Sequence, residues 1–191
     1  MLFRSYGAHA KSRSKFNHYK WMAEEYLRHS GLKNTILRPT LVYGPHDHFV
    51  TRWIRKLNAF PVVMILGRGR NLLQPISVGD VTQCVAKIME EPEKFYKIYD
   101  IGGPDRFTFE EMIRELSRLL KVKRKFIYCP LSVVRPLAAL AEILLPNPPF
   151  TPDELWRWMA DRVCDPGVID KEFGFSPELF WGGLKRYFTF S

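Results

Sequence analysis

Residues 35–45 read TILRPTLVYGP, and this stretch decides which fold the chain can adopt. Its β-branched and apolar residues predict a strand that begins at Thr35 and runs through Arg38-Pro39 to Tyr43. Gly44-Pro45 is a turn signal, so we expect the strand to end there. A strand needs partners, and the segments on either side of this one indicate what they are.

Helices and further strands alternate on both sides of this stretch. Before it, Ser12 or Ser14 offers an N-cap for a helix over residues 15–30, which Gly31 ends. We expect one face of that helix to be apolar and buried, and we expect Asp80 to be the N-cap of a later helix. The order of the elements predicts an α/β fold with a mainly parallel sheet. The apolar face of the first helix consists of Phe16, Tyr19, Ala23, Tyr26 and Leu27, and the other expected elements are strands at 2–6, 62–66, 74–78 and 97–101 and helices at 49–59 and 81–90.

The C-terminal half contains two capping boxes, in which a Thr at the N-cap and a Glu three residues later accept each other's backbone N–H groups. They lie at Thr108–Glu111 and Thr151–Glu154, and each predicts the start of a helix. Residues 131–145 are mostly apolar but too few to span a membrane. We consider a helix there that rests on a membrane or a partner, and we favour a packed helix because interfacial helices usually carry a strongly charged face. A strand at 126–128 and an amphipathic helix at 178–188 complete the pattern.

The chain has 191 residues, of which 46% are hydrophobic, so it can bury a core and has room for one domain or slightly more. Cys84, Cys129 and Cys164 lie far apart and form no C-x-x-C pair. This spacing excludes a zinc ribbon and a disulfide scaffold, and it is typical of a reducing compartment. No apolar run is long enough for a membrane span or a signal peptide, so we expect a cytoplasmic protein.

The net charge of +9, from 29 Lys and Arg against 20 Asp and Glu, raises the question of an anionic partner. Apart from a dense group at Lys121, Lys123, Arg124 and Lys125, the cations are spread along the chain, as on solvated faces. The chain has no basic stripe interleaved with aromatic residues and no helix-turn-helix or RNA-binding signature. We therefore expect no nucleic-acid partner, and we interpret the charge as a generic surface or as one that docks onto a protein or an anionic membrane.

Three segments resemble the NAD-dependent epimerase/dehydratase family, one of the extended or atypical short-chain dehydrogenases/reductases. They are SKFNHYKWMAEE at 14–25, the stretch at 35–45, and QPISVGDV at 74–81 followed by YDIGGP at 99–104. Their order and spacing agree with the family over most of the chain. The resemblance implies a partial Rossmann-like parallel sheet with helices on both faces, plus a small α/β region on the substrate side. It places the C-terminal half of an NAD(P)-binding domain, with interleaved substrate-side segments, at 1–104 and a C-terminal α/β cap at 105–191.

The tail resembles the atypical branch of this family. The matching pieces are FTPDEL at 150–155, FGFSP at 173–177 and GLKRY at 183–187. This branch includes the Rossmann-fold accessory subunit of respiratory complex I and its bacterial relatives. The resemblance therefore implies the C-terminal portion of an oxidoreductase-like protein whose role can be structural.

The family's catalytic pair is Tyr-x-x-x-Lys, in which the Tyr exchanges a proton with the substrate oxygen and the Lys lowers the pKa of the Tyr and holds the nicotinamide ribose. The resemblance places Phe16 at the Tyr position, and Phe has no transferable proton. It leaves Lys20 at the ribose-binding position and puts Ser5 near the catalytic Ser. Tyr19 points about 100° away from Lys20 around the helix, so it does not replace the missing Tyr. Taken without the resemblance, Lys20 and Glu24 are a surface pair beside a core aromatic residue.

Other positions take a binding role from the same resemblance. Taken alone, residues 39–42 are an ordinary buried strand. Arg68 is then an ordinary residue of an exposed turn, and Gln74 is an ordinary polar residue. With the resemblance, the nicotinamide end of NAD or NADP is lined by Pro39, Thr40, Leu41 and Val42, and the substrate by Gly44, Arg68 and Gln74.

The sequence contains neither of the family's Gly-rich phosphate loops. Gly67-Arg68-Gly69 follows a strand, but no helix opens after it. Because the family places that loop after its first strand, we expect this chain to begin near the catalytic-Ser strand and to bind NAD(P) weakly on its own. His46, Asp47 and His48 are three ligand types in one loop, but such close neighbours rarely converge on one ion, so we expect no metal site.

Three hypotheses for the function stay open. The first is an NAD(P)-binding Rossmann-fold protein that takes a dinucleotide and a small-molecule ligand, but lacks Tyr-dependent redox catalysis and the N-terminal dinucleotide-binding loop. The second is a structural or assembly module that docks onto a respiratory complex or a membrane, which places the protein at the periphery of a membrane. The third is an active sugar-nucleotide epimerase or small-molecule reductase that uses another residue as the acid.

Overall fold

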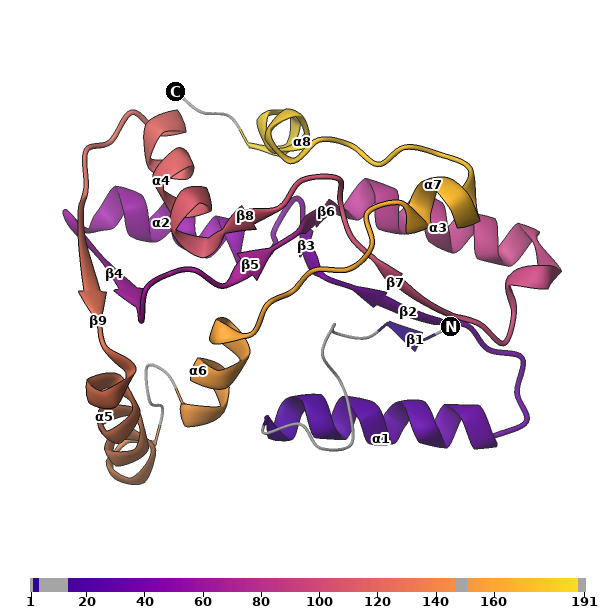
Figure 1. Cartoon of the computed structure of the whole chain (residues 1–191), viewed down its shortest axis with the longest axis horizontal. Helices are drawn as coiled ribbons and strands as arrows, with labels where there is room; N and C mark the ends of the chain where they lie inside the picture. The colour runs from indigo at the N-terminus through magenta and orange to yellow at the C-terminus, as the bar shows by residue number, and fades with distance from the viewer. Residues whose placement is uncertain (1, 4–13, 147–150, 189–191) are drawn as a thin grey trace.

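A parallel sheet of three strands lies at the centre of one half of the molecule (Figure 1). The computed structural model describes residues 2–3, 14–146 and 151–188. Ile36 lies opposite Ile98 in the middle of this sheet, so the pairing joins segments that are far apart in the chain. The predicted α/β fold with a parallel sheet is confirmed. In order across the sheet, the strands are β1 (Leu2–Phe3), β2 (Ile36–Pro39) and β7 (Ile98–Ile101).

The chain leaves this sheet at Thr40. The backbone N–H of Thr40 still donates to the carbonyl oxygen of Ile101 at 3.0 Å. The next strand, β3 (Leu41–Tyr43), pairs instead with β6 (Pro75–Ser77), also in parallel. The prediction of one strand through this stretch is therefore wrong, because two strands with different partners take its place. The break brings the C-terminal ends of β2 and β7 next to the start of β3, and this is the side on which open α/β sheets bind ligands.

Helices cover both faces of the three-stranded sheet, as the resemblance implies (Figure 1). One face carries α1 (Lys15–His29), and the other carries α3 (Val78–Glu90) and α7 (Val168–Phe173). The face with α3 and α7 is a continuous apolar core. Its buried members are Leu37, Ile76, Val81, Cys84, Ile88, Tyr99, Ile101, Ile169 and Phe173.

The start of α3 differs from the sequence prediction in its cap. Ser77 is the N-cap residue, and its hydroxyl accepts a hydrogen bond from the Gly79 N–H at 3.1 Å. Asp80 lies inside the first turn, where its carboxylate accepts from the backbone N–H of Glu178 at 3.1 Å. The predicted Asp80 cap is therefore wrong, because Ser77 supplies the cap three residues earlier and Asp80 ties α3 to the C-terminal segment.

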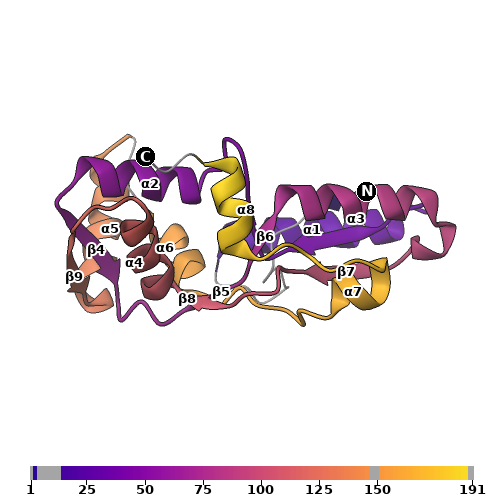
Figure 2. The same ribbon diagram turned by 90° about the horizontal axis from the view of Figure 1, so that it is seen from above.

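The remaining elements lie mostly beside the sheet and form a second lobe (Figure 2). They are α2 (Val50–Ala59), β4 (Val62–Leu66), β5 (Leu72–Leu73), β8 (Phe107–Thr108), α4 (Phe109–Leu119), β9 (Lys125–Cys129), α5 (Leu131–Leu144), α6 (Pro152–Met159) and α8 (Phe180–Tyr187). The short 3-10 helix η1 (Pro92–Lys94) belongs to the first lobe, where it contacts α3. β4 pairs with β9 in parallel, and β5 pairs with β8 in antiparallel fashion. Both predicted capping boxes are present, at the starts of α4 and α6.

The buried clusters of the two lobes do not follow the order of the chain. The core of the second lobe combines Trp53 and Leu57 of α2 with Leu116 of α4 and Phe180 of α8. Conversely, α7 near the C-terminus packs on the sheet of the first lobe. The chain thus crosses between the lobes several times, and the two-part division at residue 104 stays a prediction.

The apolar residues of α1 face outward, contrary to the predicted buried face. The buried side chain of α1 is Glu24, with none of its surface exposed, whereas Tyr19 is 65% and Tyr26 is 82% exposed. The reason is Arg38 on β2, whose guanidinium pairs with the Glu24 carboxylate. A carboxylate that leaves water needs such a partner, and this pair fixes which side of α1 faces the sheet. Lys20 and Glu24 are therefore not the surface pair that their spacing predicts.

α5 packs on the rest of the molecule through a narrow face. Within this helix, all of which the structure describes, the buried side chains are Val134 and Ala138, which pack with Leu155 of α6. The prediction of a packed helix holds for this face alone, because most other side chains of α5 are exposed. In the described part of the chain, no helix is long and apolar enough to cross a membrane.

We predict that Glu24→Ala lowers the free energy of unfolding by about 3 kcal/mol, because it removes the buried carboxylate that binds the Arg38 guanidinium and leaves that group only the more distant carboxylate of Asp100. Urea unfolding followed by circular dichroism measures this loss. Glu25→Ala is the matched control, since Glu25 pairs with Arg28 at the surface, and its cost is about 0–1 kcal/mol. Equal losses for the two variants would contradict the prediction.

Candidate functional site

The start of α1 is held against the second lobe. Ser14 is its N-cap, and the Ser14 hydroxyl donates to Asp153 of α6 at 3.0 Å. The other carboxylate oxygen of Asp153 accepts from the Lys15 N–H at 2.6 Å. A negative charge at a helix N-terminus is favourable because the free N–H groups there carry partial positive charge. The first turns of α1, with Phe16 and Lys20, are thereby fixed where the two lobes meet.

Phe16 and Lys20 lie together on one face of α1, as their spacing predicts. The ammonium of Lys20 is 5.4 Å from the centre of the Phe16 ring, which is the geometry of a cation–π contact. Phe16 is 40% exposed, so the ring is not a core residue. The pair therefore presents a cation beside an accessible aromatic face, without a hydroxyl group at the position where the resemblance places the family's Tyr.

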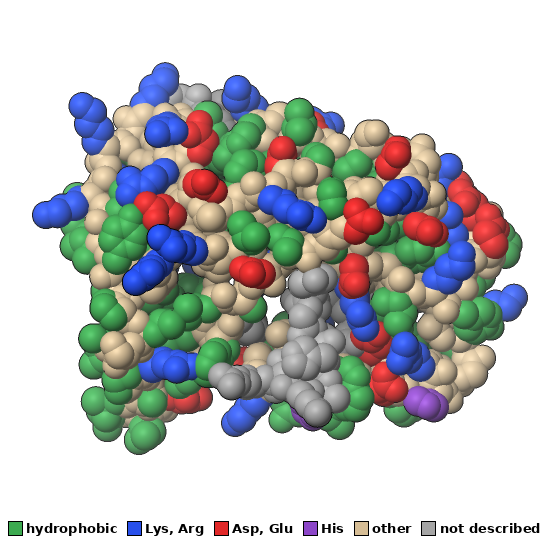
Figure 3. All heavy atoms as spheres, in the orientation of Figure 1, with side chains coloured by type: hydrophobic (Ala, Val, Ile, Leu, Met, Phe, Trp, Pro, Cys, Tyr) green, Lys and Arg blue, Asp and Glu red, His purple; other side chains and the backbone are tan. Residues whose placement is uncertain are grey.

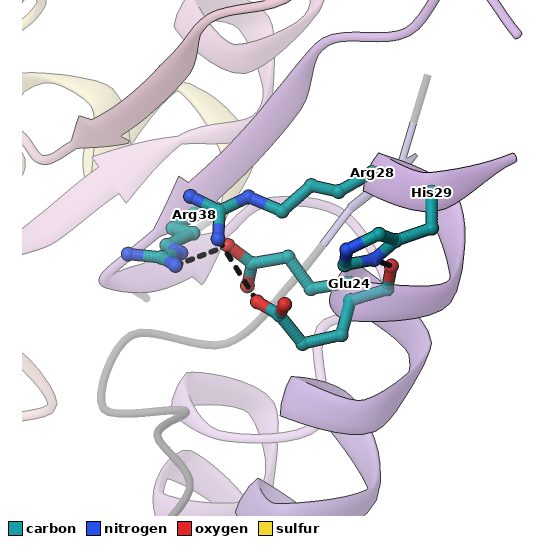
Figure 4. Close-up of polar contacts among 5 residues, drawn as sticks. Glu24, Arg28, His29 and Arg38 are labelled. Carbon is teal, nitrogen blue, oxygen red and sulfur yellow. Dashed lines mark hydrogen bonds and ion pairs between the residues drawn. The ribbon is translucent and has the colours of Figure 1, made fainter. Parts of the chain in front are cut away.

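An ion-pair cluster holds α1 in place behind this pair (Figure 4). Glu24 extends from α1 toward Arg38 on β2, and the guanidinium of Arg38 binds its carboxylate. A second guanidinium nitrogen lies 3.7 Å from a carboxylate oxygen of Asp100, which is the register partner of Arg38 on β7. Burial raises the pKa of Asp100, and the Arg38 guanidinium opposes that shift. The cluster ties α1, β2 and β7 into one unit.

Gln74 joins the strand ends on the ligand side of the sheet. It is fully buried, and its amide NH₂ donates to the carbonyl oxygen of Gly103 at 2.7 Å, while its amide oxygen accepts from the Cys164 N–H at 2.8 Å. The Thr40 hydroxyl donates to the backbone oxygen of Gln74. Both ends of the Gln74 amide are thus hydrogen-bonded to the backbone. The role of Gln74 in substrate binding stays a prediction.

The other predicted binding residues lie in different environments. Pro39, Thr40 and Leu41 are buried and Val42 is half-buried. Gly44 lies against α3 so closely that a Cβ atom there would be 2.5 Å from a methyl carbon of Val78, so only glycine fits. The structure brings Thr40 and Gln74 together, whereas Arg68 is exposed in the turn after β4 and Ser5 lies outside the described residues.

A narrow aromatic pocket in the second lobe was not predicted from the sequence. It lies between α2, β4, α4 and α6, and the amide nitrogen of Asn71 at its wall is buried without a hydrogen-bond partner among the described residues. The ammonium of Lys56 lies 4.8 Å from the Trp53 ring beside it, and burial and then Arg52 lower the pKa of Lys56. Trp53 and Trp158 are the features of the sequence that could have indicated this pocket. The lining residues are Trp53, Met64, Leu66, Asn71, Phe109, Trp158 and Met159.

An open groove of about 640 Å³ runs along β7 and α7. Its wall carries the carboxylates of Asp100, Asp165 and Glu172 and the thiol of Cys164. Burial raises the pKa of the Cys164 thiol to about 12, so this sulfur stays protonated at neutral pH and is a poor nucleophile. The groove therefore offers polar contacts but no reactive thiolate.

The loop with two histidines has a structural role at α2. The Asp47 carboxylate accepts from the Phe49 N–H at 2.7 Å and from the Val50 N–H at 2.5 Å, and so caps the free end of that helix. In the ranges that the structure describes, no group of three or more His, Cys, Asp or Glu side chains could hold a metal ion.

Comparison with known proteins decides the family. The model of the NAD dependent epimerase/dehydratase family matches residues 8–102. The chain belongs to this family. The match covers α1 with Phe16 and Lys20, the Arg38 strand and the Gln74 segment, which are the residues around the junction of the lobes.

Two curated relatives are subunits of a respiratory enzyme. The chain is 26% identical over 145 residues to the mitochondrial NADH dehydrogenase [ubiquinone] 1 alpha subcomplex subunit 9 of Arabidopsis thaliana, covering 75% of this chain and 36% of that protein. It is 25% identical over 174 residues to the mitochondrial NADH-ubiquinone oxidoreductase 40 kDa subunit of Neurospora crassa, covering 91% and 45%. The chain thus spans less than half the length of these relatives.

Solved structures share the fold. A dTDP-glucose 4,6-dehydratase from Streptomyces venezuelae, with NAD and a nucleotide ligand bound, superposes with a TM-score of 0.66 at 19% identity, covering 98% of this chain and 53% of that one. A UDP-glucose 4-epimerase from Thermotoga maritima gives 0.63 at 21% identity, covering 88% and 50%. These similarities confirm the Rossmann-like architecture.

We predict that Gln74→Leu destabilises the fold by about 2–5 kcal/mol, because it leaves the Gly103 carbonyl and the Cys164 N–H buried without partners. Chemical unfolding of purified variants measures the change. Gln83→Leu, at an exposed position on α3, is the matched control and changes the stability by about 0.5 kcal/mol or less. A similar effect at both positions would contradict the structural role of Gln74.

Proposed function

We propose that this chain forms part of an NAD(P)-binding site of the epimerase/dehydratase type that lacks Tyr-dependent proton transfer. The observation that carries the proposal is Phe16, which stands four residues before Lys20 on the same face of α1. A phenyl ring can neither donate nor accept a proton. A substrate oxygen beside it therefore meets no acid or base from this position.

The residues present fit the nicotinamide end of the dinucleotide. Lys20 forms no ion pair with the described residues, since the neighbouring Glu24 pairs with Arg38. Its ammonium can therefore donate to the hydroxyls of a ribose. Thr40 directly follows the carboxyl end of β2, on the ligand side of the sheet, and Val42 lies in the next strand, β3. NAD(P) supplies a hydride donor or acceptor when bound, and the share of this chain is to bind and orient it.

The ligand class that we propose beside the dinucleotide is a sugar nucleotide. The narrow aromatic pocket has apolar walls, and the buried Asn71 amide nitrogen there can donate a hydrogen bond to a ligand group that reaches it. Arg68, exposed in the turn after β4, is a cation suited to a phosphate. Structural neighbours support this class, because one was solved with UDP-glucose and NAD and another with UDP-glucose.

A second candidate function is that of an assembly module, which docks onto a protein complex or a membrane. The observation that favours it is the exposed apolar surface of α5, which has no enzymatic use at the junction of the lobes. The names of the two curated relatives, both subunits of a mitochondrial NADH dehydrogenase, support it. Under this proposal the chain works at the periphery of a membrane or of a membrane-bound complex.

We predict that the 191-residue chain binds NADH and NADPH more weakly than the micromolar range, because its sequence contains no Gly-rich loop to hold the pyrophosphate. Isothermal titration calorimetry measures the affinity. Lys20→Met should abolish whatever weak binding is seen, whereas Lys33→Met, at an exposed position outside the site, should not. A micromolar dissociation constant would contradict this prediction.

We also predict that the chain shows no hydride transfer or epimerisation with UDP-glucose and NAD, because Phe16 cannot act as the acid or base. Turnover is followed by nicotinamide absorbance and by product analysis. Tyr19→Phe is the control for a substitute acid, since Tyr19 is the tyrosine nearest Lys20 in the sequence. Turnover that this substitution removes would favour the third hypothesis, an active enzyme with another acid.

A further inference from the structure

The outer side of α5 is an apolar stripe that the molecule leaves uncovered. Residues spaced three and four apart lie above one another on a helix, so the side chains at 133, 137, 140 and 144 form one line. All four are more than half exposed, and Ile143 beside them is 80% exposed. The charged residues of the helix, Arg135 and Glu142, lie on another side. The stripe consists of Val133, Leu137, Leu140 and Leu144.

The apolar surface continues from α5 onto the β4–β9 pair. Met64 and Ile127 are register partners on these two parallel strands, and they are 51% and 44% exposed. Val63 and Ile65 alternate with them and are buried on the inner face. Leu66 and Cys129, at the ends of the strands, pack with the α5–α6 contact. The stripe and the strand face therefore belong to one end of the molecule.

Cations lie on the same flank of the molecule, at the other end of β9, and we call them the cationic rim. The segment from Lys121 to Pro146 contains five Lys and Arg residues against one acidic residue, Glu142. Lys123 and Lys125 are exposed at the start of β9, and the Arg124 guanidinium binds the backbone of α2 at Leu57. Figure 3 shows hydrophobic side chains gathered over α5 and Lys and Arg side chains toward the start of β9. An apolar stripe and a group of cations on one flank of the molecule, separated by the length of β9, are together complementary to a bilayer whose headgroups are anionic.

We propose that this end of the molecule docks onto an anionic lipid surface, with the α5 stripe inserted among the acyl chains and the rim of Lys123 and Lys125 at the headgroups. The inference rests on the docking function proposed above and names its partner. It requires no span, in keeping with the absence of a helix long enough to cross a membrane in the described part of the chain. Vesicle binding tests the lipid surface as the partner, whereas nucleotide titration and turnover test the proposed dinucleotide site. The failure of either proposal is therefore seen separately.

A second copy of the chain is a poorer occupant of this surface. A two-fold pairing brings the same patch of each copy together. It can bury the apolar stripe, but the segment 121–146 offers one acidic residue, Glu142, to neutralise the cations of the rim. A bilayer receives the apolar stripe among its acyl chains while its anionic headgroups neutralise the rim.

Vesicle flotation of the 191-residue chain tests the proposal, with neutral phosphatidylcholine vesicles compared with vesicles that also contain phosphatidylglycerol. The wild-type chain should float with the anionic vesicles at about 0.1 M salt and less so at about 1 M, where charge attraction is screened. The double substitution Leu137→Glu with Leu140→Glu should lower the partition coefficient about tenfold or more. Met89→Glu, at a 74% exposed position on α3, is the matched control and should leave binding unchanged.

A second pair of variants tests the cationic rim. Lys123→Gln with Lys125→Gln should weaken binding to anionic vesicles about tenfold and reduce its salt dependence. Lys33→Gln with Lys97→Gln removes the same charge from exposed positions outside the rim and should not. Circular dichroism confirms that every variant is folded. Absence of flotation at low salt, or flotation that the α5 substitutions leave unchanged, would overturn the proposal; so would a dimer in sedimentation velocity that the α5 substitutions dissociate while vesicles bind nothing.

Discussion

The ion pair between Glu24 and Arg38 is the interaction on which the arrangement of this molecule depends. It joins the buried side chain of α1 to a strand whose other residues are apolar. A buried carboxylate without its partner is costly, so the pair permits only one rotation of α1 about its axis. That rotation directs Phe16 and Lys20 to the junction of the lobes and leaves the tyrosines of α1 in solvent.

Close backbone packing supports the same region from the other side. A Cβ atom on Gly103 would lie 1.9 Å from the carbonyl oxygen of Pro75, so β6 and the turn after β7 approach as closely as main chains can. Gln74 then bonds to both this turn and the segment at Cys164. Ligand sites need such rigid surroundings, because a small displacement of a binding group weakens its contacts. The region thus has the rigidity that the ligand site proposed for it requires.

Local signals allowed most of the helices and strands to be predicted from the sequence. The Thr108 and Thr151 capping boxes and the glycine stop at Gly31 involve neighbours in the chain, and the structure has them all. The family resemblance, drawn from the motifs around Arg38 and Lys20, is confirmed by the family match.

Most of the errors have a common cause, which is pairing between distant segments. The aromatic stripe of α1 has the period of a buried face, and its exposure follows only from Arg38 on another element. The predicted strand divides at Thr40 because its first half pairs with β7, which ends at Ile101, and its second half pairs with β6, which begins at Pro75. Both partners lie far along the chain. Gln74 has no local feature that distinguishes it from a surface glutamine. The aromatic pocket likewise needs Trp53 and Trp158 to meet across the second lobe.

The register of the central sheet also has a consequence for the order in which the chain folds during synthesis. β2 leaves the ribosome well before β7. The edge of β2 that pairs with β7 therefore stays unpaired while residues 40–97 are translated. Glu24 and Arg38 are close in the sequence, and their pair can form as soon as both have emerged. The nascent chain can therefore hold α1 against one face of β2 during this interval, and that shields an apolar strand when it is most prone to associate with other chains.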